Sequence, residues 1–204
     1  MFTGIVQGTG RVIAIEPRGG DVTMTFDPGA VTVDGVAAGD SIAVNGVCLT
    51  ATQLGPGRFS ADVSQETLSV TTLGEWRPDT RINIEKALRA GDALGGHYVT
   101  GHVDGVAVLE TRDDDARSVR MVFAVPVLLA RYIARKGSIC VDGVSLTVNA
   151  VERASFAVNL VPHTLDVTIL RDYRPGTRVN FEIDIIARYV ERMFITPHED
   201  PSAR

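Results

Sequence analysis

Short runs in which apolar and polar residues alternate dominate this chain, and they predict β-strands. Met24 and Phe26 alternate with polar neighbours, and residues 119–125 show the same period of two. Turn-forming triplets at residues 55–57 (GPG) and 174–176 (RPG) separate such runs. The pattern contains none of the long crossover helices that a parallel sheet requires. The sequence therefore predicts an all-β fold of small barrels.

Two segments have helical spacing instead. Leu129 and Ile133 belong to an apolar stripe that predicts one short helix, with Gly137 as its C-terminal cap. Apolar residues also recur at helical spacing over residues 185–194, charged residues occupy the other face, and Pro197 marks the end. An amphipathic helix of about three turns does not persist alone in water. Its apolar face must therefore pack on its own barrel or on another subunit.

The chain contains an internal duplication without gaps. Shifting the sequence by 97 residues aligns residues 3–85 with residues 100–182, and 27 of these 83 pairs are identical. Repeats of this length are domains rather than solenoid units, which have about 20 to 50 residues. We predict one barrel over residues 1–97, a second over residues 98–184, and a helix with its tail over residues 185–204.

The charge pattern argues against several classes of partner. The net charge is -5 and the sequence has no Lys/Arg cluster, so neither nucleic acid nor an anionic membrane surface is an expected partner. The densest apolar run, residues 123–130, is shorter than the roughly 18 residues that span a bilayer. The N-terminus lacks a basic leader ahead of an apolar stretch. We expect a cytoplasmic protein.

The cysteines and histidines form no metal-binding motif. Cys48 and Cys140 lack CxxC spacing, which argues against a disulfide framework and a cysteine zinc site. His97 and His102 would lie on opposite faces of a strand, a poor start for a pair of metal ligands. We expect no metal.

Two equivalent segments, residues 45–50 (NGVCLT) and 142–147 (DGVSLT), each predict a tight turn that enters a strand. Because side chains alternate along a strand, Cys48 and Thr50 face one side and Leu49 the other. The second segment repeats this arrangement with serine in place of cysteine. Small polar residues can simply fill a barrel interior, but their recurrence in both halves favours a pair of sites.

The two halves differ in chemistry although their frames correspond. Cys48 aligns with Ser145, and Ile5 aligns with His102. An accessible cysteine can act as a nucleophile, and a histidine can move protons near neutral pH. Each also has a structural interpretation, because a free cysteine is often an inert apolar residue. Cys140 is expected to be such a residue.

Four segments in order, residues 1–8, 45–50, 95–105 and 142–147, resemble the riboflavin synthase family. The resemblance covers nearly the whole chain. It implies two six-stranded antiparallel Greek-key barrels, and a homotrimer in which three chains associate through their C-terminal helices. It also implies an enzyme without a cofactor that converts two molecules of 6,7-dimethyl-8-ribityllumazine into riboflavin and 5-amino-6-ribitylaminouracil. Its active site would lie between the N-terminal barrel of one chain and the C-terminal barrel of a neighbour.

The resemblance also assigns the residues that bind substrate. In the N-terminal pocket they are Gly4, Ile5, Val6, Ser41, Cys48, Leu49, Thr50, Asp62, Val63, Ser64, Gln65, Glu66 and Thr67. In the C-terminal pocket they are Gly101, His102, Val103, Lys136, Ser145, Leu146, Thr147, Val161, Pro162, His163, Thr164, Leu165 and Asp166. His163 departs from the family pattern, in which a glutamate commonly precedes this threonine, as Glu66 precedes Thr67 in the first repeat.

Four of these residues are the candidates for catalysis. Cys48 is expected to supply the nucleophilic or polar group of the N-terminal pocket, and His102, Ser145 and Thr147 the acid/base and hydrogen-bonding groups opposite. Two other functions share parts of this pattern: a paralogue that binds a lumazine or flavin without catalysis, and a structural or adaptor pair of barrels. Ligand-type residues in both halves argue against the first. The sequence offers no exposed motif that favours the second.

Overall fold

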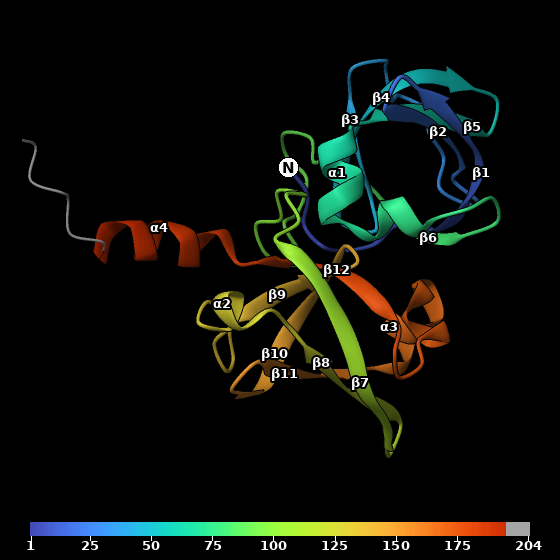
Figure 1. Ribbon diagram of the computed structural model, residues 1–204. Coiled ribbons are helices and arrows are strands. Elements are labelled where there is room, and N and C mark those ends of the chain that lie inside the picture. The colour runs from blue at the N-terminus through green and yellow to red at the C-terminus, as the bar shows by residue number, and fades with distance from the viewer. Residues whose placement is uncertain (195–204) are drawn as a thin grey trace, which may run out of the picture.

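The computed structural model describes residues 1–194, which form two closed antiparallel β-barrels of the same topology (Figure 1). Each barrel is built from the strands of one repeat, as the duplication predicts, and has the six strands that the family resemblance implies. The N-terminal barrel lies at the top of Figure 1 and the C-terminal barrel below it, and helix α4 extends away from both.

The strands and short helices of the two barrels correspond one to one. The first barrel comprises β1 (Gly8–Arg18), β2 (Asp21–Asp27), β3 (Ser41–Val44), β4 (Val47–Gly55), β5 (Arg58–Val63) and β6 (Arg81–Lys86). The second comprises β7 (Gly105–Asp115), β8 (Ser118–Ala124), β9 (Ser138–Val141), β10 (Val144–Glu152), β11 (Ser155–Leu160) and β12 (Arg178–Ile183). The β5–β6 connection holds α1 (Gln65–Val70) and the 3-10 helix η1 (Thr72–Glu75), and the β11–β12 connection holds α3 (Pro162–Val167) and η2 (Ile169–Asp172).

The strand order confirms the Greek-key expectation. In the first barrel β3, β4 and β5 are consecutive antiparallel neighbours, and β6 returns to pair with β3. Pairing of β6 with β1 then closes the barrel, so that no strand edge is left open. The domain boundaries at residues 97 and 184 fall outside the strands and stay predictions.

The alternating positions form the barrel cores. Met24 and Phe26 of β2 are buried, and Phe26 packs against Phe59 with ring centroids 4.9 Å apart. The second barrel repeats this contact between Phe123 and Phe156, at 5.4 Å. Because these pairs are equivalent in the two repeats, the duplicated sequence produces the same packing twice.

The short helix before Gly137 is only partly as predicted. Helix α2 (Val127–Ala130) is a single turn, and hydrogen-bonded turns rather than further helix follow it. Lys136, not Gly137, adopts the left-handed conformation, with φ of 68°. The reason is tertiary: the Lys136 N–H donates to the Val148 carbonyl of β10 at 2.8 Å, which draws the loop back onto the barrel.

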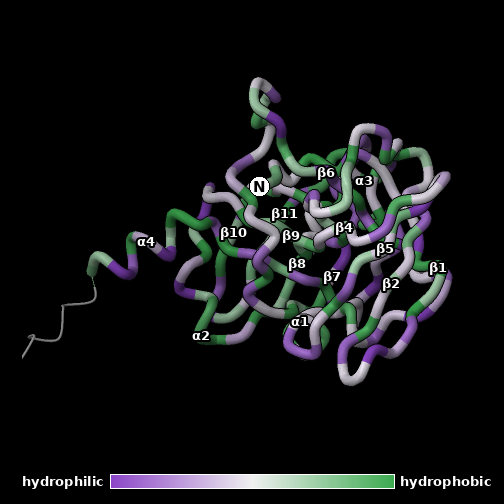
Figure 2. The backbone as a smooth tube through the Cα atoms, turned by 90° about the horizontal axis from the view of Figure 1, so that it is seen from above, coloured by the Kyte–Doolittle hydropathy of each residue, from purple (hydrophilic) through white to green (hydrophobic). Residues whose placement is uncertain are grey.

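Helix α4 (Ile185–Phe194) confirms the helical pattern of the tail and exposes its apolar side chains. Ile186, Tyr189 and Met193 have exposed fractions of 59%, 67% and 84%. In Figure 2 the helix protrudes from the rest of the molecule, and apolar and polar residues alternate along it. Pro197, expected to end the helix, lies outside the described residues.

The charged face of α4 contacts its own barrel instead. Arg188 forms an ion pair with Asp104, and Glu191 lies 3.7 Å from Arg131. Packing of the apolar face on its own barrel, one of the two alternatives for this helix, is therefore not what the chain adopts. Within residues 1–194, none of the helices combines the length and the apolar character that a bilayer crossing requires.

Candidate functional site

Two short segments cross from one repeat onto the barrel of the other. The N-terminal segment reaches β10, where the Ser145 N–H donates to the Gly4 carbonyl at 2.7 Å. The equivalent segment of the second repeat reaches β4, where the Cys48 N–H donates to the Gly101 carbonyl at 2.9 Å. Each candidate catalytic strand is thus paired with a segment from the opposite repeat.

This exchange corrects the predicted composition of the two pockets. Val6 packs against the core of the second barrel, and Val103 packs against the core of the first. Residues 4–6 therefore belong with the C-terminal barrel and residues 101–103 with the N-terminal barrel, the reverse of the prediction. Alignment of the repeats identifies equivalent positions, whereas the barrel that a segment contacts depends on where the chain crosses between domains.

Only glycine fits at the two crossing points. Gly4 and Gly101 have φ of +76° and +78°, a region that residues with a Cβ rarely adopt. A Cβ on Gly4 would lie 2.6 Å from the Cβ of Ser145, and one on Gly101 would lie 2.6 Å from the Cβ of Cys48. The backbone itself thus forms part of the surface beside each candidate side chain.

Two buried glutamates hold the crossing segments in place. Glu85 accepts hydrogen bonds from the Thr3 N–H and hydroxyl, each at 2.7 Å, and from the Gly4 N–H at 3.0 Å. Glu182 accepts the same set from Thr100 and the glycine that follows it. Burial raises the pKa of both carboxyl groups, while the hydrogen bonds oppose this rise. In each repeat, hydrogen bonds thus join the first aligned residue, Thr3 or Thr100, to the last, Glu85 or Glu182.

The polar faces lie outside the barrels. Leu49 and Leu146 are buried in the two cores, whereas Cys48 and Ser145 are half-buried on the opposite face. The alternation predicted from the sequence is therefore confirmed, and the alternative in which the small polar residues fill a barrel interior is wrong. Thr50, next on the same face as Cys48, is exposed.

Strand pairing gathers the residues of the N-terminal pocket around β4. Thr50 pairs with Ser41 of β3, and on the other side of β4 Ala51 pairs with Ala61 of β5, the residue before Asp62. Residues 63–67 lead from β5 into α1. Val63 is buried in the first barrel core, so it does not share a surface with Cys48, contrary to the prediction. The segment beginning at Gly101 adjoins Cys48 itself.

The C-terminal pocket has the same construction around β10. Thr147 pairs with Ser138 of β9, and residues 161–166 lead from β11 into α3. Lys136 is fixed near Thr147 by its backbone bond to Val148. Ser145 and Thr147 thus share one outward face near Lys136, whereas Leu146, predicted for the same pocket, is buried in the second barrel core.

The helices that border the two pockets begin differently. Ser64 caps α1 by accepting a hydrogen bond from the Thr67 N–H at 3.2 Å. Helix α3 has no side-chain cap: Val161 precedes it and Pro162, which has no N–H, occupies its first turn. His163 follows and is exposed. The departure from the family pattern therefore lies at the rim of the C-terminal pocket.

His102 is separated from the C-terminal residues with which it was grouped. It follows Gly101, which lies on the N-terminal barrel, and its side chain is exposed. It lines a hollow of about 530 Å³ beside α4, together with Thr100, Glu182, Ile185, Arg188 and Tyr189. The predicted association of His102 with Ser145 and Thr147 is therefore not found within one chain.

His97 contacts the site although no sequence pattern placed it there. Its Nδ1 lies 2.6 Å from the hydroxyl of Ser145, and burial lowers the pKa of its imidazole. The residue precedes the aligned repeat, so comparison of the two halves gives no signal for it.

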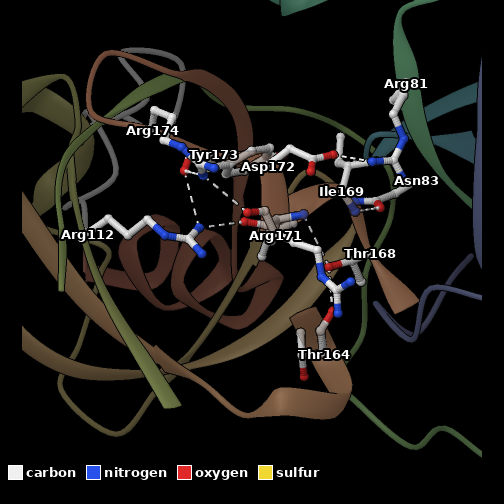
Figure 3. Close-up of polar contacts among 11 residues, drawn as sticks. Arg81, Asn83, Arg112, Thr164, Thr168, Ile169, Arg171, Asp172, Tyr173 and Arg174 are labelled. Carbon is white, nitrogen blue, oxygen red and sulfur yellow. Dashed lines mark hydrogen bonds and ion pairs between the residues drawn. The ribbon is translucent and has the colours of Figure 1, made fainter. Parts of the chain in front are cut away.

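A network of buried asparagines joins the two barrels. Asn83 accepts the Ile169 N–H at 2.9 Å, a bond that Figure 3 shows between β6 and the helix following α3. Asn180, its equivalent, accepts the Thr72 N–H at 2.8 Å. Each asparagine also donates to the turn of the other repeat, at 2.8 and 3.0 Å. The identity of Asn83 and Asn180 between the repeats was the signal that could have indicated this role.

The turn of the second repeat holds a buried acid that the first repeat lacks. Asp142 accepts the Asn180 N–H at 2.8 Å and the hydroxyl hydrogen of Tyr173. Burial raises the pKa of this carboxyl to about 7, although both hydrogen bonds lower it. Asn45 occupies the equivalent position and accepts the Asn83 N–H at 2.6 Å. Of the two equivalent turns, only that of the second repeat therefore carries a titratable side chain.

The other cysteine has the structural role expected for it. Cys140 is buried between the barrels with Phe2 and Val99, and burial raises the pKa of its thiol well above the ordinary value. Both cysteines are free. No cluster of three or more potential metal ligands occurs in the part of the chain that the structure describes.

Comparisons with known proteins agree with the duplicated architecture. Residues 3–87 and 100–184 each match the family described as the lumazine binding domain. The solved structure of LumP complexed with riboflavin superimposes with a TM-score of 0.83 and 24% identity, covering 90% of this chain and 99% of that one. This similarity in structure supports the fold.

Curated relatives match along almost the whole chain. The riboflavin synthase of Mycobacterium tuberculosis (strain ATCC 25618 / H37Rv) is 46% identical over 197 residues, which are 95% of this chain and 98% of that protein. The Photobacterium phosphoreum riboflavin synthase is 42% identical, covering 96% and 89% of the two chains. The Bacillus subtilis riboflavin synthase is 36% identical, covering 98% and 93%. The chain, with its two lumazine binding domains, therefore belongs to the riboflavin synthase family.

Proposed function

We propose that this protein is a riboflavin synthase that converts two molecules of 6,7-dimethyl-8-ribityllumazine into riboflavin and 5-amino-6-ribitylaminouracil. The observation that carries the proposal is the full-length similarity to riboflavin synthases, at 36% to 46% identity. The two barrels support it, because each presents a threonine, Thr50 or Thr147, on the same outward strand face as a different central side chain, Cys48 or Ser145. Two similar but unequal pockets suit two identical molecules with different roles.

The reaction is a transfer of four carbons between two copies of one substrate. One lumazine loses a proton from its C7 methyl group, and the resulting carbanion attacks the other lumazine after a nucleophile has added to it. The donor leaves as the pyrimidine, so no external oxidant or reductant is needed. Holding the two rings face to face converts a bimolecular step into an effectively unimolecular one. Hydrogen bonds to the developing anion lower the barrier further.

The candidate side chains suit these steps. Cys48 supplies the nucleophilic or polar group of the first pocket. Ser145 and Thr147 supply hydrogen bonds in the second, and His102, exposed at the edge of its hollow, is available for proton transfer. His102 lies on the surface of the N-terminal barrel and Ser145 on that of the C-terminal barrel. Both can therefore act in one reaction only if the N-terminal pocket of one chain faces the C-terminal pocket of another.

We further propose that the active unit is a homotrimer assembled through α4. The apolar side chains of this helix are exposed while its charged side chains contact their own chain. An exposed apolar helix face of this kind requires a partner surface. In such a trimer the N-terminal pocket of one chain would face the C-terminal pocket of its neighbour. The two free cysteines suit the reducing cytoplasm, where we propose that the enzyme acts.

Incubation of the purified protein with 6,7-dimethyl-8-ribityllumazine alone tests the proposed activity. Riboflavin and the pyrimidine are expected in equal amounts without any added metal or cofactor. Chromatographic quantification of both products provides the measurement. Bound lumazine without turnover would instead identify a binding protein and contradict the proposal.

Replacing Cys48 by alanine is expected to lower kcat by about tenfold or more, because the first pocket loses its reactive side chain. The melting temperature should fall only modestly, since Cys48 is half-buried and lies outside the first barrel core, although it packs against the apolar cluster of Phe2 and Val99. Steady-state kinetics and thermal unfolding provide the measurements. Cys48→Ser, which copies Ser145 of the second repeat, serves as the matched control for a role in hydrogen bonding alone. Full activity of Cys48→Ala would exclude Cys48 from catalysis.

Substituting Ile186, Tyr189 and Met193 together by serine is expected to yield monomers with greatly reduced activity. The three side chains are exposed in the single chain, so the barrels should remain folded. Sedimentation velocity measures the mass, and the riboflavin assay measures the activity. As a control, Arg192→Ser changes an exposed charged residue of the same helix and should leave the oligomer intact. Persistence of trimers in the triple variant would refute the role of α4.

A further inference from the structure

His97 and Ser145 form a close polar contact at the joint between the two repeats. The imidazole Nδ1 lies 2.6 Å from the Ser145 hydroxyl oxygen, and His97 is only 8% exposed. The His97 N–H donates to the Thr3 carbonyl at 3.1 Å, which fixes the backbone. Gly96 allows this approach, because a Cβ there would lie 2.1 Å from the Thr3 carbonyl oxygen. The backbone contacts of Gly96 and His97 with Thr3 therefore position the imidazole against Ser145.

Burial favours the neutral form of this imidazole. Burial lowers the pKa of His97, and the carboxylate of Asp184 acts in the opposite direction but is the smaller influence. A neutral imidazole carries one proton, on either Nδ1 or Nε2. Nε2 is the one buried side-chain nitrogen or oxygen that has no hydrogen-bond partner among residues 1–194.

The environment of Nε2 decides the position of the proton. A proton on Nε2 would be a buried donor without an acceptor, which is costly. A proton on Nδ1 is instead donated to the Ser145 oxygen, and Nε2 is then a hydrogen-bond acceptor without a partner rather than a donor without one. The Ser145 oxygen then accepts from His97, so its own hydrogen is free for a different acceptor. The half-buried position of Ser145 on the outer face of β10 makes that hydrogen available to a bound molecule.

Among residues 1–194, the first repeat shows no equivalent of this contact. Cys48, which corresponds to Ser145, meets Gly101 through its backbone N–H, and no histidine in this range forms a hydrogen bond with its side chain. The contact between His97 and Ser145 therefore distinguishes the C-terminal pocket from the N-terminal pocket, and the alignment of the repeats does not reveal this difference.

We propose that His97 is a positioning residue that fixes Ser145 as a hydrogen-bond donor to the lumazine in the C-terminal pocket. This inference rests on the proposed riboflavin synthase function. His97 acts through Ser145 and need not touch the substrate. Its contribution is to remove the alternative orientations of the hydroxyl group, so that the donor points at the substrate before negative charge develops there.

Kinetics of two variants of the full-length protein test the proposal. His97→Phe keeps a ring but removes the hydrogen bond, and we expect kcat to fall by about tenfold while KM changes by less than about twofold. His97→Asn can place an amide donor where Nδ1 lies, and should recover kcat to within about threefold of the wild type. A residue that only fills space would show the opposite order, because asparagine leaves the larger void.

A double-mutant cycle and a spectroscopic measurement complete the test. In a Ser145→Ala background His97→Phe should cause no further loss of kcat, since the two residues act as one unit. Nitrogen NMR of wild-type protein labelled at histidine should locate the His97 proton on Nδ1. Additive effects, wild-type kcat in His97→Phe, or a proton on Nε2 would each overturn the proposal.

The design separates this inference from the proposed function. If the wild type makes no riboflavin, the proposed function fails, whereas the NMR measurement still reports the position of the proton. If the wild type is active and the variants behave as described for a space-filling residue, only the role of His97 fails. If the His97→Phe variant does not fold, His97→Gln replaces it. The glutamine side chain is longer than that of asparagine, so its amide lies away from the Nδ1 position and the hydrogen bond to Ser145 is lost.

Discussion

Replacing Gly4 by alanine is expected to destabilise the protein by about 3 kcal/mol or more and to abolish most riboflavin formation. Two costs combine at this position. A residue with a Cβ is strained at φ of +76°, and the new Cβ would lie 2.7 Å from the Ser145 backbone nitrogen. Relief of that overlap must move β10 or the crossing segment, so the C-terminal pocket changes shape. Chemical denaturation measures the stability, and the riboflavin assay measures the activity.

Gly57→Ala is the matched control for this prediction. Gly57 has φ of +63°, but a Cβ added there would meet nothing within 4 Å. Its replacement should therefore cost only the conformational strain, about 1 kcal/mol, and leave activity unchanged. Equal losses in the two variants would show that the crossing point is not crowded. Gly101→Ala should behave like Gly4→Ala, because the equivalent contact is with Cys48.

Replacing Asp142 by asparagine is expected to remove a large part of the pH dependence of stability. In the folded protein burial raises the pKa of Asp142 to about 7 from an ordinary value of 3.8. Between these values the folded state binds more protons than the unfolded state, so the wild type loses stability as the pH rises from about 4 to about 7. The total loss is on the order of 4 kcal/mol, at about 1.4 kcal/mol for each pKa unit.

Asparagine cannot ionise, so the variant should lack this loss. The free energy of unfolding of Asp142→Asn minus that of the wild type, measured by chemical denaturation at pH 4 through 8, should increase from about pH 4 to about pH 7 and stay level above that. The replacement is structurally mild, because Asn45 occupies the equivalent turn of the first repeat and accepts the same type of backbone bond.

Asp114→Asn, at an exposed position near the end of β7, is the control for a change in net charge alone. It should follow the wild-type pH dependence. A parallel pH dependence in Asp142→Asn and the wild type would contradict the assignment of this titration to Asp142.

Much of the fold was predictable because it depends on local periodicity. Side chains alternate along a strand whatever its partner, so the pattern at Met24 and Phe26 identified the buried face before any strand pairing was known. The turn residues acted in the same local way: Gly46 and Gly143 have φ of 74° and 80°, as their position before a strand predicts. The helical spacing of residues 185–194 likewise predicted α4.

The duplication extended this local information to the whole architecture. Once one repeat was a barrel, the ungapped alignment required the other to be a barrel of the same topology. The face of Cys48 and Thr50, and that of Ser145 and Thr147, followed from the same register. The family resemblance then supplied the function, which the residues alone would have left open.

The strands, the turns, the two equivalent barrels and the residues that share one strand face all follow from neighbouring residues or from the repeat, so they could be read from the chain. That the polar faces lie outside the barrels became clear only from the packing of Leu49 and Leu146 in the cores. Tertiary structure alone decided that residues 4–6 and 101–103 exchange barrels and that His97 meets Ser145, 48 positions away. It also decided that the charged face of α4, rather than its apolar face, contacts its own chain. These contacts join residues far apart in the chain, so they depend on how two closed barrels are placed against each other, and no local pattern records that placement.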